Sequence, residues 1–287
     1  MLNQDPPIEK LRLAVNLLDQ KNFKQSLSLA HDMLKVFPKS MILFNIIGAS
    51  NSGLKQFDDA IKSYKKALEL NPNYAEAYYN MGIAFKNMGS HVSAIDCYKK
   101  ALKIQPKYAD ANYNMGNALK FIGDLEAAIK SYKYAINNKP DFVEAYNNMG
   151  NTLLDIGDHV KAIQTFLQAI KIKPNYPDTY KNLGFAMKMV NFTEPNSDLQ
   201  EIISSIIDKK NIINPIKISR AAISLLKFDS VIKKLLEKSL SGKINESVES
   251  IVSDLSKNPL LLKLMSVCAI PDPQLEAAFR DIRYSLI

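Results

Sequence analysis

The sequence predicts an all-α protein built as a solenoid of paired helices, and a fixed period of 34 residues is the main observation behind this prediction. Prolines recur at positions 38, 72, 106, 140 and 174, and glycines recur at positions 48, 82, 116, 150 and 184. The composition, 47% hydrophobic and 23% charged, is that of a globular chain. A constant period of this length indicates helix-turn-helix units that stack to bury a shared core and offer an extended binding surface.

Each period contains the parts of two helices. If each repeat is numbered so that its recurring glycine is position 8, position 20 is a recurring alanine. Neither residue has a bulky side chain, so the two helices of a repeat can approach closely. Proline at position 32 cannot continue a helix and also moves the residue before it out of helical geometry. With the glycine counted as position 8, the full repeats are residues 41–74, 75–108, 109–142 and 143–176. Position 24 is aromatic and fills the space between neighbouring repeats, as Tyr64, Tyr98, Tyr132 and Phe166.

The turn between the two helices of a repeat also has a recurring sequence. It reads Gly89-Ser90, Gly123-Asp124 and Gly157-Asp158, which suits a helix stop followed by a cap. The sequence therefore predicts a short turn inside each repeat and another at the proline.

Both ends of the array differ from the repeat. Residues 1–40 are predicted to hold a degenerate N-terminal repeat or cap, in which Ala14 takes the glycine position and Ser26 the alanine position. Residues 41–190 form the array, with four full repeats and one further helix. The period fails after Met189, so residues 191–287 are predicted to be a C-terminal helical cap or connector.

The repeat resembles the tetratricopeptide repeat (TPR) over residues 41–190, and more weakly over residues 7–40. The resemblance implies a right-handed superhelical TPR solenoid in which the first helix of each pair lines a concave groove. The spacing of 3.6 residues per turn around buried positions 4, 7, 8 and 11 turns positions 2, 5, 6, 9, 12 and 13 into that groove.

Polar side chains recur at these groove positions. Position 6 carries the asparagine row, which is Asn80, Asn114, Asn148 and Asn182, and position 9 adds Asn117 and Asn151. Position 5 carries Tyr79 and Tyr113. Position 2 carries the acidic row, which is Glu76, Asp110, Glu144 and Asp178. These twelve residues are the predicted partner-binding residues.

An asparagine side chain offers both hydrogen-bond donors and an acceptor, so the asparagine row is suited to hold the backbone of an extended peptide. The acidic row would favour a protein or peptide partner with basic side chains. The arrangement resembles the superhelical region of O-GlcNAc transferases, where an asparagine ladder holds substrate peptides. In the alternative interpretation, these asparagines support the neighbouring turn or bind water.

The net charge of +8 raises the question of nucleic-acid binding. Lysines are predicted to face outward on the second helices, away from a polar and locally acidic groove, which argues against nucleic acid as the groove's ligand. Binding through the outer basic face is a third hypothesis, and it would show a steep salt dependence. These lysines are Lys62, Lys65, Lys66, Lys99, Lys100, Lys130 and Lys133.

The sequence contains no motif that points to catalysis. It has no glycine-rich phosphate loop, no nucleophile elbow and no metal-ligand spacing, and Cys97 and Cys268 lie far apart. We therefore predict no catalytic residues, no bound metal and no cofactor. The N-terminal residues lack a signal-peptide pattern and no apolar run reaches about 18 residues, so a cytoplasmic protein without membrane contact is predicted.

Two functional hypotheses follow. The first is a non-enzymatic scaffold that binds extended peptides or protein partners in the groove. The second is the substrate-recruiting N-terminal part of a methyltransferase or glycosyltransferase whose catalytic domain lies outside this chain. It comes from the segment 260–283, which is similar to a connector between TPRs and such domains in bacterial proteins. The alternative for that segment is a plain helical cap. The sequence gives no prediction of the oligomeric state.

Overall fold

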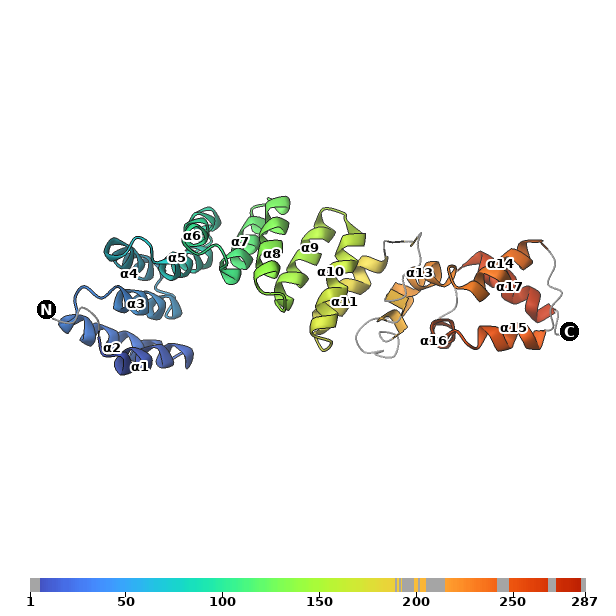
Figure 1. Cartoon of the computed structure of the whole chain (residues 1–287), viewed down its shortest axis with the longest axis horizontal. Coiled ribbons are helices and arrows are strands. Elements are labelled where there is room, and N and C mark those ends of the chain that lie inside the picture. Colours follow the sequence, from blue (N-terminus) through green and yellow to red (C-terminus); the bar gives the residue numbers. More distant parts are fainter. Residues whose placement is uncertain are drawn as a thin grey trace. The chain divides into compact units, whose positions relative to one another are not determined.

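The computed structural model describes residues 6–188, 190, 192, 199–200, 202–204, 215–241, 248–267 and 272–284. Every regular element among these residues is an α-helix (Figure 1). The predicted all-α array of paired helices is confirmed. The chain divides into two compact units, Met1–Asn148 and Met149–Ile287.

The N-terminal unit contains four helix pairs and the beginning of a ninth helix. Each helix from the first to the seventh packs against the next, and the first helices of the four pairs contact one another in succession. The helices are α1 (Ile8–Asp19), α2 (Phe23–Val36), α3 (Met41–Gly53), α4 (Phe57–Leu70), α5 (Ala75–Asn87), α6 (His91–Ile104), α7 (Ala109–Phe121), α8 (Leu125–Asn138) and α9 (Val143–Asp155).

The turn inside each repeat depends on one residue with a positive φ. Gly89, Gly123 and Gly157 have φ of +81°, +86° and +81°, a conformation in which glycine has no steric penalty. Lys21 and Lys55 adopt the same conformation, with φ of 61° and 63°, at the corresponding positions of the first two helix pairs. The glycine pattern predicted three of these turns and missed the two made by lysine.

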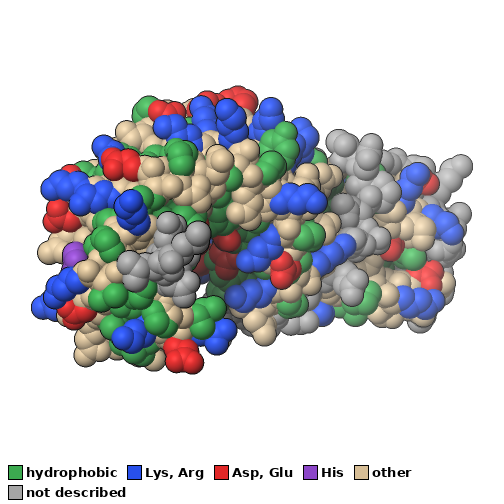
Figure 2. All heavy atoms as spheres, turned by 60° about the vertical axis from the view of Figure 1, so that its left-hand side comes forward, with side chains coloured by type: hydrophobic (Ala, Val, Ile, Leu, Met, Phe, Trp, Pro, Cys, Tyr) green, Lys and Arg blue, Asp and Glu red, His purple; other side chains and the backbone are tan. Residues whose placement is uncertain are grey.

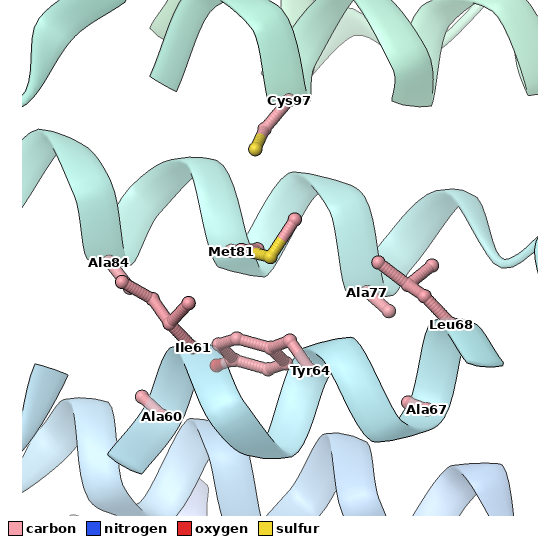
Figure 3. Close-up of a cluster of buried hydrophobic side chains, with 9 residues drawn as sticks. All are labelled: Ala60, Ile61, Tyr64, Ala67, Leu68, Ala77, Met81, Ala84 and Cys97. Atoms are coloured by element: carbon pink, nitrogen blue, oxygen red, sulfur yellow. The ribbon is translucent and has the colours of Figure 1, made fainter. Parts of the chain in front are cut away.

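The aromatic residue at position 24 packs directly on the glycine at position 8 of the same repeat. A Cβ atom on Gly82 would lie 2.6 Å from Cε1 of Tyr98, and one on Gly116 would lie 2.7 Å from Cε1 of Tyr132. Figure 3 shows the corresponding ring of Tyr64 between α4 and α5. Because no side chain fits in this contact, the period requires glycine at position 8 wherever position 24 is aromatic.

In the first helix pair position 24 is Ala30, which has no ring, and a hydrogen bond at another position links the two helices. Ser26 in α2 donates from Oγ to the carbonyl oxygen of Ala14 in α1 at 2.9 Å, and both residues are fully buried. Ala14 stands at position 8 and Ser26 at position 20, so the two departures from the repeat pattern in this segment contact each other directly.

The C-terminal unit begins with helices of the repeat and then departs from the repeat pattern. Helix α10 packs on α11, α11 packs on α13, α13 packs on α16, and α14 packs on α15 and α17. Leu183 and Met187 of α11 are fully buried. The helices are α10 (His159–Ile172), α11 (Pro177–Lys188), α13 (Pro215–Leu226), α14 (Ser230–Ser241), α15 (Val248–Leu255), α16 (Pro259–Val267) and α17 (Pro273–Tyr284).

One helix start in this unit is capped by an aspartate. Asp272 accepts hydrogen bonds at Oδ1 from the backbone N–H groups of Gln274 and Leu275, at 3.1 Å and 3.0 Å. Its other carboxylate oxygen lies 2.7 Å from Nζ of Lys227. Within the described ranges, no helix has both the length and the apolar character that a membrane crossing requires.

Candidate functional site

The predicted binding residues of the N-terminal unit lie on the first helices of the repeats. We call the surface formed by α3, α5, α7 and the start of α9 the first-helix face. The acids of position 2 are exposed there. The predicted tyrosines and asparagines are half-buried, namely Tyr79, Asn80, Tyr113, Asn114, Asn117 and Asn148. This difference in exposure separates side chains that take part in packing from those that reach solvent.

The asparagine row links neighbouring repeats in this unit. In each case the side-chain amide at position 6 donates to the side chain at position 5 of the preceding repeat, 35 residues earlier. The bonds are Asn80 Nδ2 to Asn45 Oδ1, Asn114 Nδ2 to Tyr79 Oη, and Asn148 Nδ2 to Tyr113 Oη, each at 3.1 Å. These asparagines therefore hold one first helix against the next.

The remaining N–H groups of two of these amides are also used. Asn114 Nδ2 donates to the carbonyl oxygen of Asp110 at 3.1 Å, and Asn148 Nδ2 donates to Oδ1 of Asn117 at 2.8 Å. The same oxygen of Asn117 accepts a bond of 2.8 Å from the hydroxyl of Tyr132. That these amides clamp a peptide stays a prediction, and the donors it would require are engaged within the chain.

Tyr79 and Tyr113 stand in equivalent surroundings one repeat apart. The ring centroid of Tyr79 lies 4.8 Å from that of Tyr108, and the centroid of Tyr113 lies 4.8 Å from that of Phe142. Each hydroxyl accepts a bond from the asparagine row, and within the described residues neither donates one. Burial, together with the Asp110 carboxylate, raises the pKa of Tyr79 to about 12, so its hydroxyl is a donor at neutral pH.

The acids Glu76, Asp110 and Glu144 lie in the first turns of α5, α7 and α9, where the helix dipole favours negative charge. All three are exposed. Within the part of the chain that the structure describes, no lysine or arginine pairs with any of them. Glu76 Oε1 accepts a bond of 3.0 Å from Nδ2 of Asn45. These three members of the acidic row therefore present carboxylates to solvent without a lysine or arginine partner.

The predicted residues of the C-terminal unit are fewer. Asn151 and Asn182 are half-buried, and Asp178 is exposed with Nζ of Lys181 at 3.6 Å from its carboxylate. Position 24 in this unit is Phe166, which has no hydroxyl to bond Asn151 as Tyr132 bonds Asn117. The two units thus carry different chemistry at equivalent positions.

The lysines predicted to face outward are all exposed on α4, α6 and α8. Two of them lie over aromatic rings of first helices: Nζ of Lys66 is 5.6 Å from the Phe44 centroid, and Nζ of Lys100 is 5.6 Å from the Tyr78 centroid. Figure 2, in which the N-terminal end comes forward, shows lysine and arginine side chains across the outer surface and acidic side chains inside a hollow.

The sequence analysis missed three residues of this face. Asn45 bonds both Asn80 and Glu76, and Tyr74 and Tyr108 stand directly before α5 and α7. The sequence does mark the two tyrosines, because position 34 is aromatic in all four full repeats. It was overlooked since position 34 lies outside the helices.

The comparisons with known families agree with the repeat. Profiles described as TPR repeat match residues 54–89, 122–157 and 150–190, and profiles described as tetratricopeptide repeat match residues 75–108 and 97–130. Together these matches cover residues 54–190, over which the chain is similar to tetratricopeptide repeats. Such repeats are in general scaffolds that bind proteins and peptides.

Relatives match only part of the chain. Peroxisomal targeting signal receptors of Saccharomyces cerevisiae and Candida glabrata are 29% and 32% identical to it over 85 and 89 residues. These matches cover 30% of this chain and only 14% and 15% of the receptors. Human tetratricopeptide repeat protein 28 is 30% identical over 84 residues, which is 29% of this chain and 3% of that protein.

Solved TPR structures share the fold. A crystal structure of MamA superimposes with a TM-score of 0.52 and 27% identity, covering 56% of this chain and 94% of MamA. YrrB, a TPR protein with an unusual peptide-binding site, gives 0.50 with 18% identity over 62% of this chain and 91% of YrrB. At that identity the likeness to YrrB concerns the fold alone.

Proposed function

We propose that this chain is a protein-interaction module that binds an extended segment of a partner protein along its first-helix face. The observation that carries the proposal is the repetition, in successive repeats, of an exposed carboxylate without a cation and a tyrosine hydroxyl with an unassigned hydrogen. Groups repeated at equal intervals suit a ligand that is itself extended.

The residues of this face divide into two roles. Glu76, Asp110 and Glu144 reach solvent and are available to attract basic groups of a partner. Tyr79 and Tyr113 have hydroxyls that can donate to backbone carbonyl groups of a peptide. The asparagine row fixes the tyrosines in place, so its members act as positioning residues, and Asn80 retains an amide oxygen for a direct contact.

The comparisons support the class of function. The yeast relatives are receptors for a peroxisomal targeting signal, and the part they share with this chain corresponds to 30% of its length. They give no support to the hypothesis that the segment 260–283 connects the repeats to a transferase, and that hypothesis is not part of the proposal.

A selection from a random library of 12-residue peptides tests the proposal. Peptides enriched on the full chain are then offered to a variant with Glu76→Lys, Asp110→Lys and Glu144→Lys. The matched control reverses one exposed acid on each of the second helices α4, α6 and α8, as Glu69→Lys, Asp96→Lys and Glu126→Lys.

We expect the control variant to retain the selected peptides and the first-helix variant to lose them, with helicity by circular dichroism unchanged in both. Retention of the peptides by the first-helix variant, or failure of any peptide to be enriched, would contradict the proposal.

A further inference from the structure

One group of residues on the first-helix face differs from its counterparts in the other repeats. Tyr74 and Tyr108 stand directly before α5 and α7, and Tyr79 lies one turn into α5 with its ring centroid 4.8 Å from that of Tyr108. Glu76 and Asp110 lie in the first turns of the same two helices. We call these five residues the Tyr108 cluster.

Both carboxylates of the cluster act on the same hydroxyl. Burial raises the pKa of Tyr108 above the usual range, and Tyr79, Glu76 and Asp110 raise it further. Among the described residues, no lysine or arginine pairs with either carboxylate; Nζ of Lys86 reaches the amide oxygen of Asn114 at 3.5 Å instead. Two carboxylates without a paired lysine or arginine therefore lie in the same cluster as three tyrosines.

The later repeats provide that positive charge from within the chain. In two of them a lysine three residues before the aromatic residue of position 34 lies over its ring. The pairs are Lys139 over Phe142, with Nζ at 4.6 Å from the centroid, and Lys173 over Tyr176, at 5.2 Å. At Tyr108 the corresponding residue is Gln105, which is uncharged. Tyr108, whose hydroxyl is influenced by two carboxylates, is thus an aromatic residue of position 34 without a lysine three residues before it.

A buried tyrosine beside the cluster has a hydroxyl without a hydrogen-bond partner. Tyr98 is fully buried, its ring centroid lies 6.1 Å from that of Tyr79, and its hydroxyl makes no hydrogen bond. One repeat later, the equivalent hydroxyl of Tyr132 donates to Asn117 at 2.8 Å. The residue equivalent to Asn117 is Ile83, which cannot accept a bond. The hydroxyl of Tyr98 is therefore a buried polar group without a hydrogen-bond partner next to Tyr79.

We propose that the Tyr108 cluster binds the guanidinium group of an arginine side chain in the partner peptide, an inference that rests on the proposed function. A guanidinium is planar, carries five donors and stacks on aromatic rings, so it can bond both carboxylates while lying against the tyrosines. A lysine ammonium is compact and strongly hydrated, and it matches this combination less well.

The test uses the peptides selected from the random 12-residue library. We expect arginine to be enriched at one position, and replacement of that arginine by citrulline, which keeps the shape and removes the charge, to weaken binding about tenfold. The variant Glu76→Gln with Asp110→Asn should weaken the arginine peptide by a similar factor and leave the citrulline peptide unchanged. The matched control is Glu69→Gln with Asp96→Asn, which should leave both peptides unchanged.

The outcomes separate the two proposals. Selected peptides that show no preference for arginine, or that bind equally well with citrulline, overturn the arginine site while peptide binding itself stands. Equal affinity for lysine in place of arginine overturns the choice of a guanidinium. A selection that enriches no peptide overturns both proposals together.

Discussion

Removal of the side-chain amide of Asn114 should weaken the joint between the second and third full repeats. Its Nδ2 lies 3.1 Å from the hydroxyl oxygen of Tyr79 and 3.1 Å from the carbonyl oxygen of Asp110. Each bond contributes about 1 kcal/mol net, and the higher helix propensity of alanine offsets at most about 0.7 kcal/mol. We therefore expect Asn114→Ala to lower the free energy of unfolding by about 1–2 kcal/mol.

The assay is urea unfolding followed by circular dichroism and fitted with a nearest-neighbour description of the repeats, because such arrays need not unfold in one step. The matched control is Asn87→Ala, an exposed asparagine near the end of α5, which should change stability by less than about 0.5 kcal/mol. A double-mutant cycle of Asn114→Ala with Tyr79→Phe should give a coupling of about 1 kcal/mol. Equal effects of the two alanine variants, or a coupling near zero, would refute the positioning role of Asn114.

Three further predictions concern the packing beneath this face. Gly82→Ala gains at most about 1 kcal/mol of helix propensity but drives a Cβ atom to 2.6 Å from Tyr98, so the melting temperature should fall; an increase would show that the contact is not tight. Tyr98→Phe removes a buried hydroxyl that has no partner and should leave stability unchanged or raised, whereas Tyr132→Phe loses the bond to Asn117 and should lower stability by about 1 kcal/mol. Matching effects of these two variants would contradict the difference in bonding. Burial raises the pKa of the Cys97 thiol to about 11, so iodoacetamide at pH 8 should label it, by peptide mapping, far more slowly in the native chain than in urea, and equal rates would contradict its burial.

The sequence was sufficient to predict the helix pairs because the repeat sets a residue at each close contact. Gly82 and Tyr98 are 16 residues apart, and their recurrence every 34 residues reflects a contact that the structure shows directly. The turns at Lys21 and Lys55 could not be predicted in the same way, since nothing in a lysine marks a positive φ. A local structure can be predicted from the sequence where only one type of residue fits it, and not where several types of residue are tolerated.

The contacts of the first-helix face were predicted only in part. The positions of Asn114 and Asn148 on the first helices follow from the period, but their partners do not. Whether an amide at position 6 meets a peptide or the tyrosine of the preceding repeat depends on how far one helix stands from the next. The spacing of residues in the sequence does not give this distance between helices. The structure gives it, and it places the hydroxyls of Tyr79 and Tyr113 within hydrogen-bonding distance of the two amides.

The location of the bound peptide is the most direct test of the central claim. A photoreactive benzoylphenylalanine is placed at residue 144, which is exposed on the first-helix face, or at residue 126, which is exposed on α8. Each variant is irradiated with the peptide selected on the unmodified chain, and adducts are identified by mass spectrometry. The account predicts adducts from residue 144 and none from residue 126. Adducts from residue 126, with none from residue 144, would show that the peptide binds the outer surface and would contradict it.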